Sequence, residues 1–146
     1  MKIMTCFIDS SAWTAIADKT DENHKAASEY FAKILESNSK LVTNNTAVDR
    51  ALVQIKHQAG HKTAQKFMAV LDESILTVNL RSDWLSRRLR RNAVNLYLKS
   101  THPGLRLEHY YIFETIKRKK VDILFTFDKE LNFFGLPLMP QKTSEV

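Results

Sequence analysis

Two short apolar runs of this chain each stop at an aspartate. One run is Cys6-Phe7-Ile8 before Asp9, and the other, over residues 123–127, precedes Asp128. Each predicts a buried strand whose end delivers a carboxylate, and the helical patterns between them favour a parallel sheet. Ligands of open parallel sheets bind outside the carboxyl ends of the strands. Two carboxylates there can share a hard cation such as Mg²⁺, which is the chemistry of metal-assisted phosphoryl transfer.

The alternative for each aspartate is structural. An aspartate after a strand is a common N-cap of the following helix, and either residue alone favours that interpretation. As a pair on one edge of one sheet, they favour a metal site instead, and further acids should then converge on them. Ser10 and Ser11 follow Asp9, and one of these two hydroxyls is expected to cap the helix.

The apolar periodicity predicts alternating strands and helices. Strands are expected over residues 2–8, 41–43, 75–78 and 122–127, and helices over 11–18, 22–36, 47–58, 61–73, 81–99 and 105–119. Thr46 is expected to cap the third of these helices, which ends at Gly60. The buried stripe of the 22–36 helix is expected to comprise Ala26, Ala27, Tyr30, Phe31, Ile34 and Leu35. This pattern predicts an α/β three-layer sandwich with a central parallel sheet, formed by residues 1–140 as a single domain with a frayed tail over 141–146.

The composition narrows the class of protein. No apolar stretch approaches the ~20 residues that a membrane span needs. Asp9 interrupts the N-terminal apolar run too early for a signal peptide. The single cysteine, Cys6, cannot form an internal disulfide and is expected in the core. We therefore expect a cytoplasmic protein with no membrane association.

The basic charge is confined to the second half of the chain. Residues 80–146 hold 13 Lys and Arg against 7 acids, whereas residues 1–79 hold 9 of each. Four arginines within five residues, Arg87, Arg88, Arg90 and Arg91, lie on the helix predicted over 81–99. A basic helix is usually only a solvated face. This density and the guanidinium geometry suit the phosphates of a polyanion such as RNA.

Three segments resemble a known family. FIDSSAW at 7–13 resembles the opening strand of PIN domains, FTFDKELNFFG at 125–135 resembles their closing strand, and Thr43-Asn44-Asn45 matches their second strand and turn. Within this family the chain resembles the single-domain VapC-like toxins of toxin–antitoxin pairs. It implies a ribonuclease dependent on Mg²⁺ or Mn²⁺, an RNA substrate, a small antitoxin protein as partner and a homodimer. It also implies that a hydroxyl at Ser10 helps to hold the metal-bound water beside the RNA.

Two positions depart from the PIN pattern. The resemblance implies a Glu where this chain has Arg50 and an Asp where it has His109, while Asp49 and Glu108 each stand one residue earlier. In one interpretation, slipped registers let Glu108 join the two aspartates as metal ligand and catalytic residue, with Asp49 as a weaker fourth acid. In the other, the site is degraded, Arg50 pairs with an aspartate in place of the cation, and the protein binds nucleic acid or a protein partner without cleavage. The sequence leaves both open.

Overall fold

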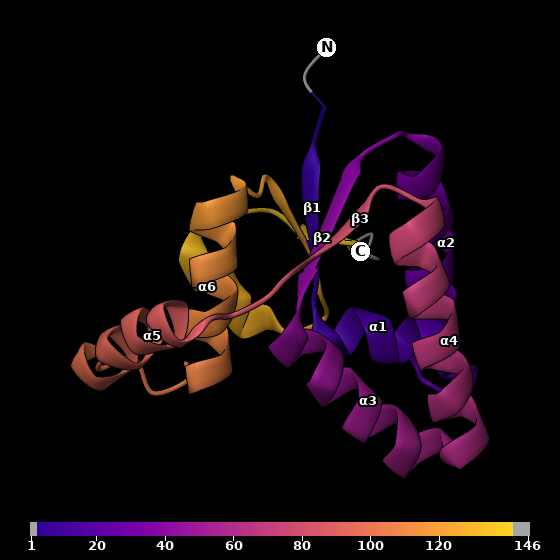
Figure 1. The fold of residues 1–146 in the computed structure, drawn as a ribbon, viewed down its shortest axis with the longest axis horizontal. Coiled ribbons are helices and arrows are strands. Elements are labelled where there is room, and N and C mark those ends of the chain that lie inside the picture. The colour runs from indigo at the N-terminus through magenta and orange to yellow at the C-terminus, as the bar shows by residue number, and fades with distance from the viewer. Residues whose placement is uncertain (1–2, 142–146) are drawn as a thin grey trace, which may run out of the picture.

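The computed structural model describes residues 3–141 and is built around one parallel sheet. Its five strands lie in the order β3-β2-β1-β4-β5, and every neighbouring pair is parallel (Figure 1). The strands are β1 (Thr5–Ile8), β2 (Lys40–Asn44), β3 (Leu80–Asp83), β4 (Ile123–Phe125) and β5 (Leu138–Met139). In register, Phe7 of β1 stands between Val42 and Leu124. The predicted α/β fold with a central parallel sheet is confirmed.

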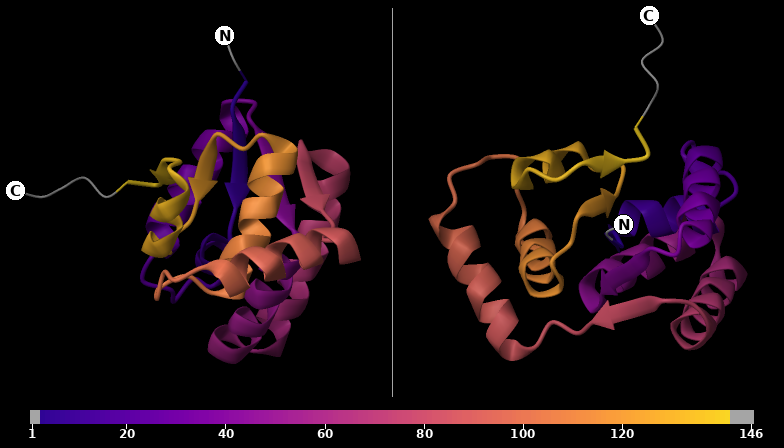
Figure 2. Two further views of the ribbon diagram at one scale, coloured as in Figure 1. Left: turned by 90° about the vertical axis from the view of Figure 1, so that its left-hand side faces the viewer. Right: turned by 90° about the horizontal axis from the view of Figure 1, so that it is seen from above.

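Helices cover both faces of this sheet. They are α1 (Ser10–Ala17), α2 (His24–Glu36), α3 (Asn45–Ala59), α4 (His61–Thr77), α5 (Arg87–Lys99) and α6 (Leu107–Lys119), with the 3-10 helix η1 (Lys129–Phe134) after β4. Figures 1 and 2 show α1 to α4 gathered on one side, and α5 and α6 on the other. The predicted three layers are therefore present.

The inner strands β1 and β4 are mostly apolar because both faces of the sheet are buried there. Cys6 and Ile8 point into the larger core, where they meet Trp13 of α1 and residues of α2 to α4. Phe7, between them, points into the opposite core with Ile112 of α6. This alternation places the carboxyl end of β1 between two packed layers and fixes the backbone that carries Asp9.

The third strand lies away from its predicted position. The strand predicted over 75–78 is wrong, because α4 continues through Thr77 and β3 spans Leu80–Asp83. The helix predicted over 81–99 correspondingly begins only at Arg87. β3 is an edge strand in which only Leu80 and Asp83 are buried, so it lacks an apolar run. β5, with two residues at the other edge, gave no sequence signal at all.

Smaller corrections concern burial, helix starts and the termini. Ala26 and Leu35, both predicted on the buried stripe of α2, are exposed. The N-cap of α3 is Asn44, whose side chain accepts the Ala47 N–H, so the predicted cap at Thr46 is wrong. Residues 142–146, nearly all of the predicted tail, lie outside the described residues. No helix in the described part of the chain is long and apolar enough to cross a membrane.

Candidate active site

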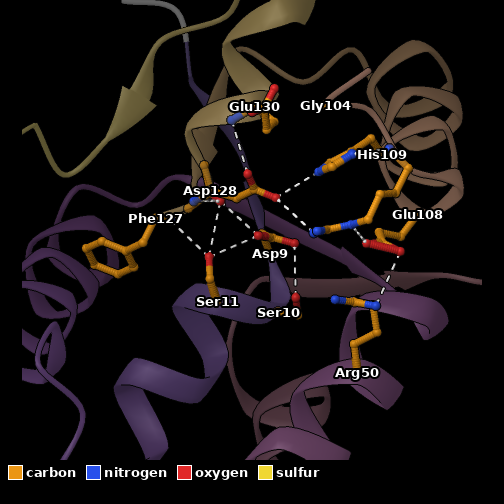
Figure 3. A network of polar contacts seen from close by, with 12 residues as sticks. Asp9, Ser10, Ser11, Arg50, Gly104, Glu108, His109, Phe127, Asp128 and Glu130 are labelled. Carbon is orange, nitrogen blue, oxygen red and sulfur yellow. Dashed lines mark hydrogen bonds and ion pairs between the residues drawn. The ribbon is translucent and has the colours of Figure 1, made fainter. Parts of the chain in front are cut away.

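Asp9 is buried at the carboxyl end of β1, with 5% of its surface exposed. Its Oδ2 accepts hydrogen bonds from the Thr126 hydroxyl at 2.8 Å and the Ser11 hydroxyl at 3.0 Å, and Ser10 Oγ lies 3.4 Å from Oδ1 (Figure 3). Asp9 stands at the N-cap position of α1, but its side chain caps no backbone N–H. The capping alternative is therefore wrong for Asp9, whose carboxylate instead faces the end of β4.

Asp128 follows β4, and together with Asp9 it forms the acidic site at this edge of the sheet, which we call the pocket. Its Oδ1 accepts the Glu130 N–H at 3.0 Å and so caps η1, while its Oδ2 lies 2.7 Å from His109 Nε2. The Asp128 backbone N–H donates to Thr126 Oγ1 at 3.0 Å. Because the same hydroxyl donates to Asp9, Thr126 joins the two aspartates. Figure 3 shows the two carboxylates in one neighbourhood, and the charges of both act on Arg106. Their positions after neighbouring parallel strands predict this proximity.

His109, on the first turn of α6, holds Asp128 in place. The side chain is 1% exposed, and its Nδ1 accepts the Arg106 backbone N–H at 2.8 Å. A ring nitrogen that accepts a hydrogen bond carries no proton, so this geometry assigns a neutral ring with its proton on Nε2. That proton is donated to Asp128. The hydrogen bond from His109 is the largest cause that lowers the pKa of Asp128, and partial burial of the carboxyl group opposes it.

Two arginines flank the aspartates. Arg106 Nε pairs with Glu108 Oε1, and Arg106 Nη2 lies 3.8 Å from Asp128 Oδ2. Arg50, on α3, reaches the other Glu108 oxygen, with Nη1 3.2 Å from Oε2. The hydrogen bond to Glu108 raises the pKa of Arg106, and the charges of Asp128 and Asp9 act in the same direction. The degraded-site interpretation pairs Arg50 with an aspartate, but in the structure the Arg50 guanidinium pairs with Glu108 instead.

The remaining predicted residues lie apart from this pocket. Asp49 is exposed on α3, and among residues 3–141 no hydrogen bond or ion pair joins it to the pocket. The four arginines predicted to bind RNA, Arg87, Arg88, Arg90 and Arg91, are exposed on α5. Sequence reasoning missed Arg106 and Thr126. Arg106 gave no signal, because an exposed arginine before a helix is ordinary, and Thr126 falls within an apolar run that indicates only a strand.

The pocket offers a cation two carboxylates. Within residues 3–141, no three His, Cys, Asp or Glu side chains come together as a metal cluster. Mg²⁺ usually keeps several waters and takes one or two carboxylates together with phosphates of its substrate. Asp9 and Asp128 suit that mode of binding. They are too few to surround a cation with protein ligands alone. Cys6 offers no thiolate alternative, because burial raises its pKa to about 12.

Comparison with known proteins gives a match in structure. No protein-family model matches the chain, and no curated protein matches its sequence. A solved structure of Mycobacterium tuberculosis VapC20, described as a sarcin-ricin loop cleaving toxin, superposes with a TM-score of 0.77 over 90% of this chain and 95% of that chain, at 18% identity. VapC20 is a PIN-domain toxin. This chain has the PIN fold.

The two residues that depart from the PIN sequence pattern lie beside the two aspartates. Arg50 and His109 both border the pocket that holds Asp9 and Asp128 (Figure 3). Of the two neighbouring side chains on α6, His109 reaches Asp128, whereas Glu108 lies between the two arginines. A neutral donor therefore occupies the place where the PIN resemblance implied an acid.

Proposed function

We propose that this PIN-fold protein is a VapC-like ribonuclease that cleaves RNA phosphodiester bonds with Mg²⁺ or Mn²⁺. The observation that carries this proposal is the convergence of Asp9 and Asp128 on Thr126 at the ends of neighbouring parallel strands. The description of VapC20 as a toxin that cleaves the sarcin-ricin loop supports RNA as the substrate class. The exposed arginines of α5 supply the charge that an RNA backbone requires.

In this mechanism Asp9 and Asp128 would hold the cation. A bound Mg²⁺ or Mn²⁺ would supply Lewis-acid chemistry, which is polarisation of the scissile phosphate and activation of a water molecule as the nucleophile. The hydroxyls of Ser11 and Thr126 fix Oδ2 of Asp9. His109 orients Asp128 and keeps it ionised, because its hydrogen bond favours the carboxylate form. Asp128 is thus ionised, and both carboxylates are held in position, before RNA arrives.

A second function is favoured by a different observation. The Arg106 guanidinium lies 3.8 Å from Asp128, and its pKa is raised in part by the charges of both aspartates. Arg106 and His109 both interact with Asp128, so the two aspartates can be stabilised by these side chains without a cation. On this basis the alternative is a degraded PIN module that binds nucleic acid, or a protein partner, without cleaving.

Metal-dependent stability and cleavage separate the two functions. We expect Mn²⁺ to raise the melting temperature of the wild type through preferential binding to the folded state, and to support cleavage of a labelled stem-loop RNA. Asp9→Asn and Asp128→Asn should each abolish both effects. Asp72→Asn, which removes an exposed acid of α4, is the matched control and should change neither. A flat Mn²⁺ titration with RNA binding but no cleavage would favour the degraded module.

We propose further properties of this ribonuclease. The PIN resemblance predicts a homodimer and a small antitoxin partner, and the composition predicts a cytoplasmic location. Light scattering on the purified protein measures the first directly. Copurification with the product of an adjacent small reading frame tests the second.

A further inference from the structure

We propose that Arg50 and Arg106 form a binding site for one RNA phosphate, and that Glu108 occupies this site while RNA is absent. The inference rests on RNA as the ligand of the proposed function, but it does not depend on cleavage. It assigns a role to Arg50, the residue that departs most from the PIN pattern.

The geometry is that of an oxyanion held by two guanidinium groups. Glu108 Oε2 lies 3.2 Å from Arg50 Nη1, and Glu108 Oε1 pairs with Arg106 Nε. Each carboxylate oxygen therefore meets a different arginine, one from α3 and one from the residue before α6. Guanidinium groups bind carboxylate and phosphate oxygens in the same charge-assisted manner. A phosphodiester can replace the Glu108 carboxylate with its two unesterified oxygens.

Exposure makes this replacement accessible. The side chains of Arg50 and Arg106 are 50% and 62% exposed, and that of Glu108 is 20% exposed. Ion pairs with this much solvent contact contribute little to stability, so breaking them costs the fold little. The arginines can keep their positions while Glu108 turns towards solvent.

The position of the arginine pair suits RNA bound across the aspartates. Arg106 contacts Asp128 on one side, so a phosphate between the arginines lies beside the acidic pocket. On the other side Arg50 lines a polar cavity of about 260 Å³ between α1 and α3. Gln54 and Gln58 line the same cavity and follow Arg50 at four-residue intervals along one face of α3. Their amides can hydrogen-bond to the nucleotide attached to the bound phosphate.

The competing explanation is that Glu108 merely ties α3 to α6. The two explanations differ in what removal of the Glu108 charge does to RNA affinity. If Glu108 is a tie, Glu108→Gln leaves affinity unchanged or reduces it. If Glu108 is an internal competitor for the arginines, the same change raises affinity.

The test is fluorescence anisotropy with a labelled single-stranded 12-nucleotide RNA in EDTA, so that cleavage plays no part. We expect Glu108→Gln to bind about 3- to 10-fold more tightly than wild type, equivalent to about 0.6–1.4 kcal/mol at the standard tenfold conversion. Arg50→Ala and Arg106→Ala should each weaken binding and reduce the log–log salt slope by roughly 0.7, the value for one phosphate bound on a single strand. Lys62→Ala removes an exposed positive charge from α4, and it is the matched control for the effect of charge removal away from the site.

Two further variants show whether a loss of binding comes from misfolding and whether Glu108 acts through Arg50. Arg50→Lys keeps the charge but loses the planar fork, and should fall between wild type and Arg50→Ala. Arg50→Ala combined with Glu108→Gln should lose most of the gain from Glu108→Gln. The proposal would be overturned if Glu108→Gln binds RNA no more tightly than wild type. It would also be overturned if both arginine variants lose no more RNA affinity than Lys62→Ala does. Failure of metal-dependent cleavage alone would leave it standing.

Discussion

The buried imidazole of His109 donates its Nε2 proton to Oδ2 of Asp128 across 2.7 Å. Its Nδ1 accepts the Arg106 backbone N–H, so the ring is neutral and adds no charge to the pocket. His109 therefore positions the Asp128 carboxylate, and because the ring is neutral it does not neutralise the charge that a metal ion would bind. A single residue replaces an expected acid and at the same time supports the acid that remains.

His109→Asp should couple stability to metal more strongly than the wild type does. Without metal, the new carboxylate repels Asp128 and removes its hydrogen-bond donor, so we expect a loss of about 1–3 kcal/mol in the free energy of unfolding. With Mn²⁺ present, a third acid strengthens the cation site, and the rise in melting temperature should exceed that of the wild type. Thermal unfolding in EDTA and in Mn²⁺ measures both effects.

The control for this change is His109→Asn, which keeps a neutral polar side chain. It should lose stability in EDTA without any added response to Mn²⁺. Equal responses of the two variants to Mn²⁺ would contradict the expectation that an acid introduced at position 109 joins the cation site.

The contribution of Asp128 to stability should depend on pH. Its pKa is lowered in the folded protein, chiefly by the hydrogen bond from His109, so the folded state favours the ionised form. That stabilisation is fully present above the unfolded pKa, about 3.9 for an aspartate, and is lost as the pH falls through the lower folded value. Asp128→Asn should therefore cost most at neutral pH and progressively less below about pH 4. Urea unfolding in EDTA from pH 7 to pH 3 measures this difference, and a cost that stays constant would be inconsistent with it.

The aspartates were predictable because their signal is local. Each follows an apolar strand, and parallel strands bring their carboxyl ends to one edge of the sheet. The partners of these aspartates were not predictable in the same way. Arg106 meets Asp128, and Arg50 meets Glu108, through interactions between segments distant in sequence that no periodicity encodes. β3 escaped detection for a related reason, because its end, Asp83, is a buried polar residue held by Thr115 and Arg118 of α6.

The α5 arginines should supply the part of RNA affinity that is independent of sequence. All four are exposed on a helix whose buried face is narrow. We expect Arg87→Ala combined with Arg91→Ala to reduce the log–log salt slope of RNA binding, by roughly 0.7 for each phosphate that the variant no longer binds. The control is Lys25→Ala combined with Lys62→Ala, which removes the same charge from α2 and α4. If both double variants have the wild-type slope, the α5 charges are merely solvated.

Asn44 should be the most sensitive polar position beneath the α3 face of the pocket. It is fully buried, its Oδ1 accepts the Ala47 N–H at 2.8 Å and the Thr46 hydroxyl at 2.9 Å, and its Nδ2 donates to Thr115 at 3.1 Å. Asn44→Ala removes the N-cap of α3 and leaves buried groups without partners, so we expect a loss of about 2–4 kcal/mol in the free energy of unfolding.

Thr46→Ala tests how much stability comes from the hydrogen bond beside the N-cap and not from the cap itself. Within residues 3–141 the Thr46 hydroxyl donates to Asn44 and makes no other hydrogen bond, and the cap bond to Ala47 does not depend on it. We therefore expect a loss of about 1 kcal/mol or less, in line with one part-buried hydrogen bond. Urea unfolding of both variants compares the two costs on one scale. A loss for Thr46→Ala as large as that for Asn44→Ala would return the capping role to Thr46, the position that the sequence pattern predicts.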